Sequence, residues 1–344
     1  AGGVVVDAAE FAGIVRSTSF PQIVFINRVC TMKTTLSFVS LVLAGLVFAV
    51  GGCSSTGQEH FDTPEKAAES LVSALRADDT KDLSRVLGPG AARILDSGDA
   101  VADRAGRDQF VADYEASHSI TDGPNGEKTL VVGAQQWPLP IPLVHSPGKG
   151  GWYFDTAAGE EELLNRRIGR NELRTIQTCL AIVDAQREYA LLDPNNDGIA
   201  AYAMRVLSTP GKKDGLYWPT AAGEPPSPLG EEIAAAAAEG YSGRRDARGG
   251  RLPFHGYYYR LLTAQGPAAP GGAMNYMING KLIAGFGILA WPAEYGNSGV
   301  MTFIVNQDGI VYEQDFGGPN GPAAINLYNP GPGWNKSDTN TLLD

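Results

Sequence analysis

Apolar residues recur at helical spacing in the segment 61–117. The apolar positions of the first predicted helix are Ala67, Ala68, Leu71, Val72 and Leu75. Thr63-Pro64 supplies an N-cap followed by proline at the first helical position. Further helices are expected at 81–87 and 108–117, and strand-like segments follow at 129–133, 136–144 and 152–155. Helices followed by a meander of strands indicate an α+β layout.

One long helix is predicted from 160 to 192. Its apolar positions, separated by three, four or eight residues, are Leu164, Ile168, Ile176, Leu180 and Val183. Arg166, Arg167 and Arg170 follow three glutamates by one or two turns, a pattern that suits either solvent-exposed ion pairs or a docking face. We expect this helix to bridge the two halves of the chain.

The second half is expected to place helices on an antiparallel sheet. A turn at 193–198 precedes a predicted helix at 199–207, and an alanine-rich helix is predicted at 231–239. The strand-like segments are 257–262, 276–278, 282–291, 300–305 and 310–314. Asn306-Gln307-Asp308-Gly309 joins the last two segments and is a strong hairpin signal. The chain therefore divides into an α+β domain at 61–158 and a long helix with an antiparallel-sheet domain at 159–344.

The segment 32–53 is typical of an export signal. Met32-Lys33 opens it, an apolar run from Leu36 to Val50 follows, and small residues precede Cys53. The run is short for a membrane-spanning helix, which needs about twenty apolar residues, although a plain membrane anchor remains the alternative. Val50-Gly51-Gly52-Cys53 resembles a lipobox, in which the cysteine is acylated.

The expected address is therefore the cell envelope, on a lipid anchor. Ser54 behind the cysteine favours the periplasmic face of the outer membrane if the cell is Gram-negative. Residues 54–60 read as a linker, and residues 1–31 are expected to be an upstream segment that is not native to the protein.

The net charge limits the class of binding partner, and the cysteine content limits the possible disulfide bonds. From Cys53 onward the chain has 36 acidic and 24 basic residues, a net charge of −12, which argues against nucleic acid as a partner. With Cys53 acylated and Cys30 upstream of the signal, Cys179 stands alone, so no intrachain disulfide is expected. Its apolar neighbours predict a buried, inert thiol.

Several long motifs resemble one protein family. They are QWPLPIPLV (136–144), GWYFDT (151–156), NRRIGRNEL (165–173), DAQREY (184–189), STPGKKDGLYWP (208–219), HGYY (255–258) and WPAEYG (291–296). Together they resemble DUF2950, a family of bacterial exported proteins of undefined function, over about 61–334. The resemblance supplies no catalytic residues to carry over.

Two looser likenesses concern the fold alone. The order of elements in 61–158 is similar to the NTF2-like fold, a cone with a pocket. The long helix, the Asp/Gly turn and the segment 208–219 are similar to the soluble part of type II secretion pseudopilins, although the helix is not at the mature N-terminus. The second likeness admits a secretion or surface-structure component as an alternative function.

Asp193, Asn195 and Asp197 place oxygens at alternate positions before Gly198, as calcium loops do. A complete loop needs a bidentate carboxylate at its twelfth position, where this chain has Met204. An Asx-rich turn explains the same residues without metal, and it is the preferred interpretation. No cofactor is expected otherwise.

His255 is the main candidate for acid–base chemistry, because three tyrosines follow it closely. A histidine at a strand edge that bonds backbone is the commoner situation. Ser298 lies in a Gly-Asn-Ser-Gly segment like that around the nucleophile of chymotrypsin-like proteases, but no histidine has the expected context. The frequent metal, nucleotide and hydrolase signatures are missing from the sequence.

The sequence thus predicts a lipid-anchored envelope protein that binds a partner or ligand and is not an enzyme. An envelope hydrolase that uses His255 with nearby carboxylates or Ser298 is the alternative, beside the pseudopilin-like component.

Overall fold

The first helix, α1 (Pro64–Ala77), has the predicted cap. The computed structural model describes residues 57–148, 150–221, 223–239, 241, 252–319 and 321–338, so the signal segment and Cys53 lie outside the described residues. Thr63 Oγ1 accepts a hydrogen bond from Lys66 N, and Asp78 ends the helix in the left-handed conformation. The predicted apolar positions are buried, because this face packs on the first sheet.

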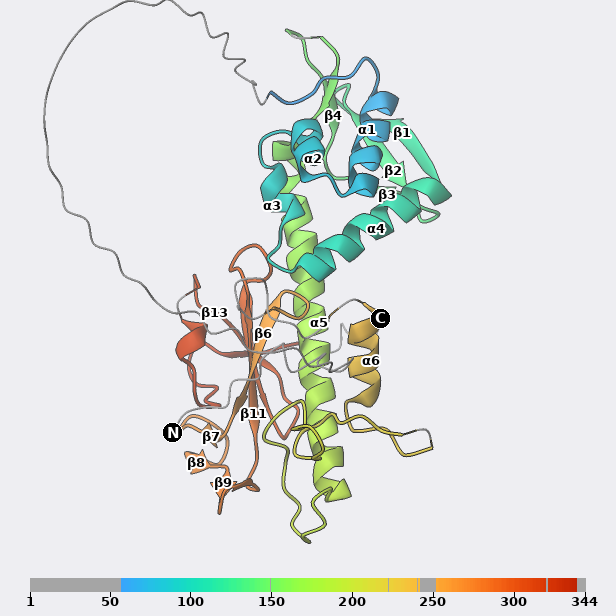
Figure 1. Ribbon diagram of the computed structural model, residues 1–344. Helices are drawn as coiled ribbons and strands as arrows, with labels where there is room; N and C mark the ends of the chain where they lie inside the picture. The colour runs from blue at the N-terminus through green and yellow to red at the C-terminus, as the bar shows by residue number, and fades with distance from the viewer. Residues whose placement is uncertain are drawn as a thin grey trace, which may run out of the picture. The chain divides into compact units, whose positions relative to one another are not determined.

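The first sheet is a short antiparallel meander. Its strands are β1 (His118–Asp122), β2 (Lys128–Val132), β3 (Trp137–Pro138), β4 (Leu143–His145) and β5 (Trp152–Phe154). The order is β1-β2-β4-β5, with β3 also paired to β2. Helices α1, α2 (Thr80–Leu87), α3 (Ala91–Leu95) and α4 (Ala100–Ala116) accompany it (Figure 1). Leu130, Leu143 and Phe154 join the helices in one apolar cluster.

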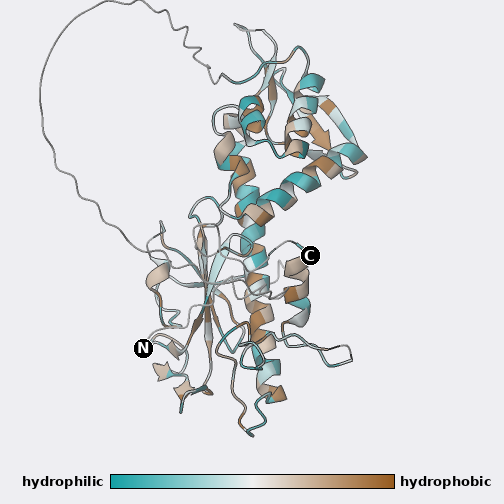
Figure 2. Ribbon diagram, viewed as in Figure 1, coloured by the Kyte–Doolittle hydropathy of each residue, from teal (hydrophilic) through white to brown (hydrophobic). Residues whose placement is uncertain are grey.

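Helix α5 (Thr156–Leu192) contributes to both halves of the described chain. Near its start, Leu163 packs against the apolar cluster of the first sheet. Further along, Ile176, Ile182 and Val183 belong to the core of the second sheet. Hydrophobic and hydrophilic stretches alternate along the helix in Figure 2. The helix of 37 residues is therefore stabilised by tertiary contacts along much of its length.

The second sheet is antiparallel, with the order β14-β13-β12-β11-β6. Its strands are β6 (Tyr257–Leu262), β11 (Gly287–Pro292), β12 (Met301–Asn306), β13 (Tyr312–Asp315) and β14 (Asn335–Lys336). Ile288 and Ala290 pack in the core that contains α5, whereas Leu289 and Trp291 join a smaller cluster. This alternation shows that β11 is buried on both faces.

Smaller elements complete the second half. Helix α6 (Gly230–Ala238) packs its Ile233 and Ala236 into the same core as α5. Two short strand pairs join β7 (Ala264–Gln265) to β8 (Met274–Asn275) and β9 (Met277–Ile278) to β10 (Lys281–Leu282). The 3-10 helix η2 (Pro322–Ala324) precedes β14. In the part of the chain that the structure describes, no helix has the length and apolarity to cross a membrane.

The predicted α+β class is confirmed, with a long helix between two antiparallel sheet regions. The prediction of a helix at 199–207 is wrong, because this segment consists of bends and isolated β-bridges. The Gln186 amide of α5 bonds both the N–H and the carbonyl of Ala203, at 2.8 and 2.9 Å. Tyr202 forms a bridge to Leu282, and Leu207 forms one to Tyr217. These tertiary partners replace the hydrogen bonds that a helix would have supplied.

Gly159 on α5 allows the helix to approach the chain before β4. A Cβ at this position would lie 2.7 Å from the carbonyl oxygen of Pro140 and 2.8 Å from Ile141 Cα. We expect Gly159→Ala to lower the free energy of unfolding by about 1–3 kcal/mol, because backbone must move to admit the methyl group. Urea unfolding measures the change.

Gly169 on the same helix is the matched control. A Cβ there would meet no atom within 4 Å. Gly169→Ala should therefore stabilise the protein by up to about 1 kcal/mol through helix propensity. Equal effects of the two substitutions would contradict the close approach at Gly159.

Candidate functional site

A buried carboxylate, Asp99, joins three separate segments beside α5. It is 2% exposed and caps α4, where its Oδ1 accepts a hydrogen bond from Ala102 N at 3.1 Å. Its Oδ2 accepts two more, from the Tyr241 hydroxyl and from Gly256 N, both at 2.9 Å. The carboxylate of Asp99 is thus stabilised by three hydrogen-bond donors.

The Tyr241 hydroxyl links Asp99 to His255. Desolvation and the charge of Asp99 raise the pKa of Tyr241, so the hydroxyl stays protonated and donates a hydrogen bond to the carboxylate. The same oxygen accepts a hydrogen bond from His255 N at 3.3 Å. Asp99 and Tyr241 therefore fix the backbone of the turn that leads into β6.

The turn itself uses two residues in the left-handed region. His255 has φ +51° and Gly256 has φ +77°. A positive φ is uncommon for histidine, and such conformations persist where surrounding contacts enforce them. At Gly256 a Cβ would lie 2.7 Å from Asn171 Nδ2 and 3.1 Å from Ser298 Cβ. Glycine is needed there because α5 and the 294–300 loop both press on the turn.

The His255 side chain lies between Arg174 of α5 and Glu239 at the end of α6. Arg174 Nη1 is 3.4 Å from His255 Nδ1, and Glu239 Oε2 is 3.7 Å from His255 Nε2. A guanidinium only donates, so Nδ1 is the acceptor and the hydrogen-bond pattern assigns the proton to Nε2. Burial and the charge of Arg174 lower the pKa of His255 to about 4. At neutral pH the imidazole is neutral, and its contact with Glu239 is not an ion pair.

Three arginines follow one another along this side of α5. Arg167 donates to the carbonyls of Arg93 and Ile94 and, at 2.6 Å, to Asn297 Oδ1. Desolvation lowers the pKa of the Arg167 guanidinium. Arg170 is exposed, yet partial desolvation and the neighbouring charge of Arg174 lower its pKa as well. Arg170 and Arg174 are therefore two exposed cations four positions apart on this side of the helix.

Ser298 has a structural role in the loop before β12. Its side chain is fully buried, and its Oγ accepts from Glu294 N at 2.9 Å and donates to Glu294 O at 3.2 Å. Asn171 holds the same loop through Ser298 O, and Glu172 accepts from Val300 N, both at 2.9 Å. The serine hydroxyl thus closes a turn, and its hydrogen bonds engage Glu294 instead of His255.

The carboxylates of the candidate calcium loop are engaged by the protein. Asp193 accepts hydrogen bonds from Asp197 N at 3.3 Å and Gly198 N at 2.8 Å. Asp197 forms an ion pair with Lys281 and accepts from Ile199 N at 3.1 Å. Among the described residues, no group of three or more histidine, cysteine or acidic side chains is arranged to hold a metal ion. The geometry is that of an Asx-type turn anchored to β10.

The Cys179 thiol offers little chemistry. Cys179 is buried, and desolvation raises the pKa of its thiol to about 12, which suits an inert core residue.

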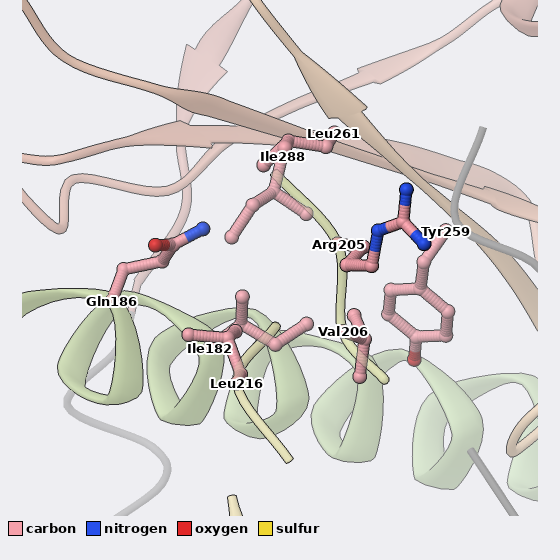
Figure 3. A pocket seen from close by; sticks show the side chains of 8 residues that line it. All are labelled: Ile182, Gln186, Arg205, Val206, Leu216, Tyr259, Leu261 and Ile288. Atoms are coloured by element: carbon pink, nitrogen blue, oxygen red, sulfur yellow. The ribbon is translucent and has the colours of Figure 1, made fainter. Parts of the chain in front are cut away.

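A small cavity lies between α5 and the second sheet. In Figure 3, Ile182 and Gln186 extend from α5 toward Leu261 and Ile288 of the second sheet. The cavity between them has a volume of about 10 Å³ and a mostly apolar lining. It has room for roughly one water molecule and not for a ligand.

Sequence reasoning singled out His255 but missed its partners. Asp99 follows Ser97-Gly98 and precedes an alanine-rich helix, so its signal was that of an ordinary N-cap. Its contact with Gly256 spans 157 positions, which no local pattern in one sequence reveals. The arginines of α5 were recognised as a possible docking face, without the neighbouring histidine.

Protonation of His255 makes stability depend on pH. Its pKa is about 4 in the folded chain and 6.5 in its unperturbed state, so the unfolded chain takes up the proton first. Folding is therefore disfavoured as the pH falls from about 6.5 toward about 4, by at most about 1.4 kcal/mol per pH unit. We expect His255→Gln to lose stability less steeply than the wild type across this window in denaturant titrations.

The control is His145→Gln, which changes an exposed histidine at the end of β4. Its stability should follow the wild-type pH profile. Parallel profiles for the wild type and His255→Gln would show that His255 does not carry this linkage.

Comparison with known proteins adds a family. A family model described as a protein of unknown function, DUF2950, matches residues 58–337. No curated protein and no solved structure matches the chain. The matched range contains Asp99, Arg174, His255 and the whole of both sheets. The resemblance seen in the sequence motifs is thereby confirmed: the chain belongs to the DUF2950 family.

Proposed function

We propose that this protein is a lipid-anchored protein of the bacterial envelope that binds a ligand or partner without transforming it. The membrane is reached through an acylated Cys53, and the folded part from residue 57 lies on the periplasmic side. The outer membrane is the expected host if the cell is Gram-negative.

The lipobox-like sequence supports the location. Val50-Gly51-Gly52-Cys53 follows a short positive start and an apolar run, which is the arrangement of an export signal. The described residues begin soon after this cysteine with a short polar linker. An anchor joined to a folded unit by a few polar residues keeps that unit near the membrane surface.

The positive face of α5 beside His255 is the observation that carries the proposed binding role. It presents Arg174 next to a neutral, well-fixed imidazole, with Arg170 one turn earlier on the same helix. Ser298, the nucleophile that the sequence suggested, is engaged by Glu294, and the Cys179 thiol is buried. Such a site favours electrostatic recognition over covalent catalysis.

An envelope hydrolase is the second candidate, and Glu239 is the observation that favours it. Its carboxylate lies 3.7 Å from His255 Nε2. A carboxylate beside a histidine can orient the imidazole so that it acts as a general base. The low pKa of His255 is compatible with a neutral imidazole that accepts a proton. However, His255 Nδ1 faces a guanidinium, so neither nitrogen is directed at a nucleophile.

Acylation of Cys53 is tested by fractionating cells that express the full-length chain. We expect the wild type in the membrane fraction, extractable by detergent, and labelled when cells are fed a radioactive fatty acid. Cys53→Ser should lose the label because the serine hydroxyl cannot take the place of the thiol. Cys179→Ser is the matched control and should keep the label.

Loss of the label from Cys179→Ser, or retention of the label by Cys53→Ser, would contradict the anchor. An unlabelled wild type that stays in the membrane would indicate a plain membrane anchor instead.

A further inference from the structure

Two exposed arginines of α5, Arg170 and Arg174, lie in a chain that is otherwise rich in acid. The net charge of the whole chain is −11, and most arginines have a carboxylate partner. These ion pairs are Arg76–Glu115, Arg85–Glu59, Arg93–Glu160, Arg104–Asp78, Arg107–Asp78, Arg166–Glu162 and Arg187–Asp184. Within the described residues, Arg170 and Arg174 form no ion pair.

The spacing of these two residues places their like charges close enough to repel each other. Arg170 and Arg174 are four positions apart on one helix, where like charges repel each other. The repulsion is visible in the lowered pKa of Arg170, whose causes are desolvation and then Arg174. The repulsion between two such cations on adjacent turns is reduced when an anion binds between them.

His255 determines where the Arg174 guanidinium lies. The imidazole is 8% exposed and offers Nδ1 as an acceptor 3.4 Å from Arg174 Nη1. The histidine is itself held by the turn that Asp99 and Tyr241 fix. One of the two cations is thus pre-organised, which lowers the entropy lost on binding.

We propose that Arg170 and Arg174 together bind the phosphate group of an envelope ligand, with His255 as the positioning residue for Arg174. This inference rests on the proposed binding function and names the class of ligand. Two guanidinium forks carry two positive charges and match the charge and the several oxygens of a phosphate dianion. A single carboxylate would neutralise only one of them.

The charge of Glu239, on the far side of His255, opposes the binding of an anion. Its carboxylate lies on the Nε2 side of His255, and its side chain is 48% exposed. Removal of its charge by Glu239→Gln should therefore strengthen phosphate binding, whereas loss of the arginines should weaken it.

The test is calorimetric titration of the full-length chain in detergent with inorganic phosphate, at constant ionic strength and with chloride as reference. We expect the double variant Arg170→Gln/Arg174→Gln to bind phosphate at least about tenfold more weakly than the wild type. Arg187→Gln removes a cation from the same helix and is the matched control. It should leave the affinity within about twofold of the wild type, since its salt bridge with Asp184 is exposed.

Vesicles distinguish the source of the phosphate. The Cys53→Ser chain, which has no acyl anchor of its own, is mixed with vesicles of phosphatidylcholine with or without phosphatidic acid. Binding that requires phosphatidic acid and is lost in the double variant assigns the site to a lipid headgroup. Binding of inorganic phosphate without vesicle binding assigns it to a soluble phosphate compound.

The proposal is overturned if neither probe binds, if the double variant binds as the wild type does, or if Arg187→Gln weakens binding equally. None of these results affects the anchor, which the fatty-acid label on Cys53 tests separately. Hydrolysis of a phosphate monoester by the wild type, abolished in His255→Gln, would instead overturn the non-enzymatic role and leave the binding site in place.

Discussion

The carboxylate of Asp99 is the interaction on which the polar centre of this protein depends. It is buried, and three donors from α4, Tyr241 and the turn at Gly256 stabilise it. A buried charge is tolerated only when its hydrogen bonds are satisfied. Because two of the donors are far from Asp99 in sequence, the need to satisfy this carboxylate specifies how α4, the segment at Tyr241 and the turn before β6 meet.

The proposed site follows from that constraint. The turn fixed by Asp99 places His255 in an unusual backbone conformation, and the buried imidazole then orients Arg174. Arg167 lies about one turn before Arg170 and two turns before Arg174. Its guanidinium donates hydrogen bonds to backbone carbonyls and to Asn297, so its role is structural. The same helix thus has an internal anchor at Arg167 and an accessible positive pair at Arg170 and Arg174. The structural and the binding roles are separated along one helix face.

The sequence was informative where periodicity decides the outcome. Strand β6 was predicted at its observed bounds, and the long helix differed only at its start, because apolar spacing reports burial directly. The segment 199–207 failed because the Gln186 amide and two strand-like bridges outweigh its helical propensity. His255 was noticed for its aromatic neighbours. Its partners Asp99, Tyr241 and Glu239 are brought together by tertiary structure, which one sequence does not encode as a local pattern.

The central claim is that Asp99 and Tyr241 act as one unit, and a double-mutant cycle tests it most directly. Asp99→Asn, Tyr241→Phe and the double variant are compared with the wild type by urea unfolding at neutral pH. The account predicts an interaction energy of about 1–3 kcal/mol, because each substitution removes the partner of the other in a buried site. Additive losses, with an interaction energy near zero, would contradict it.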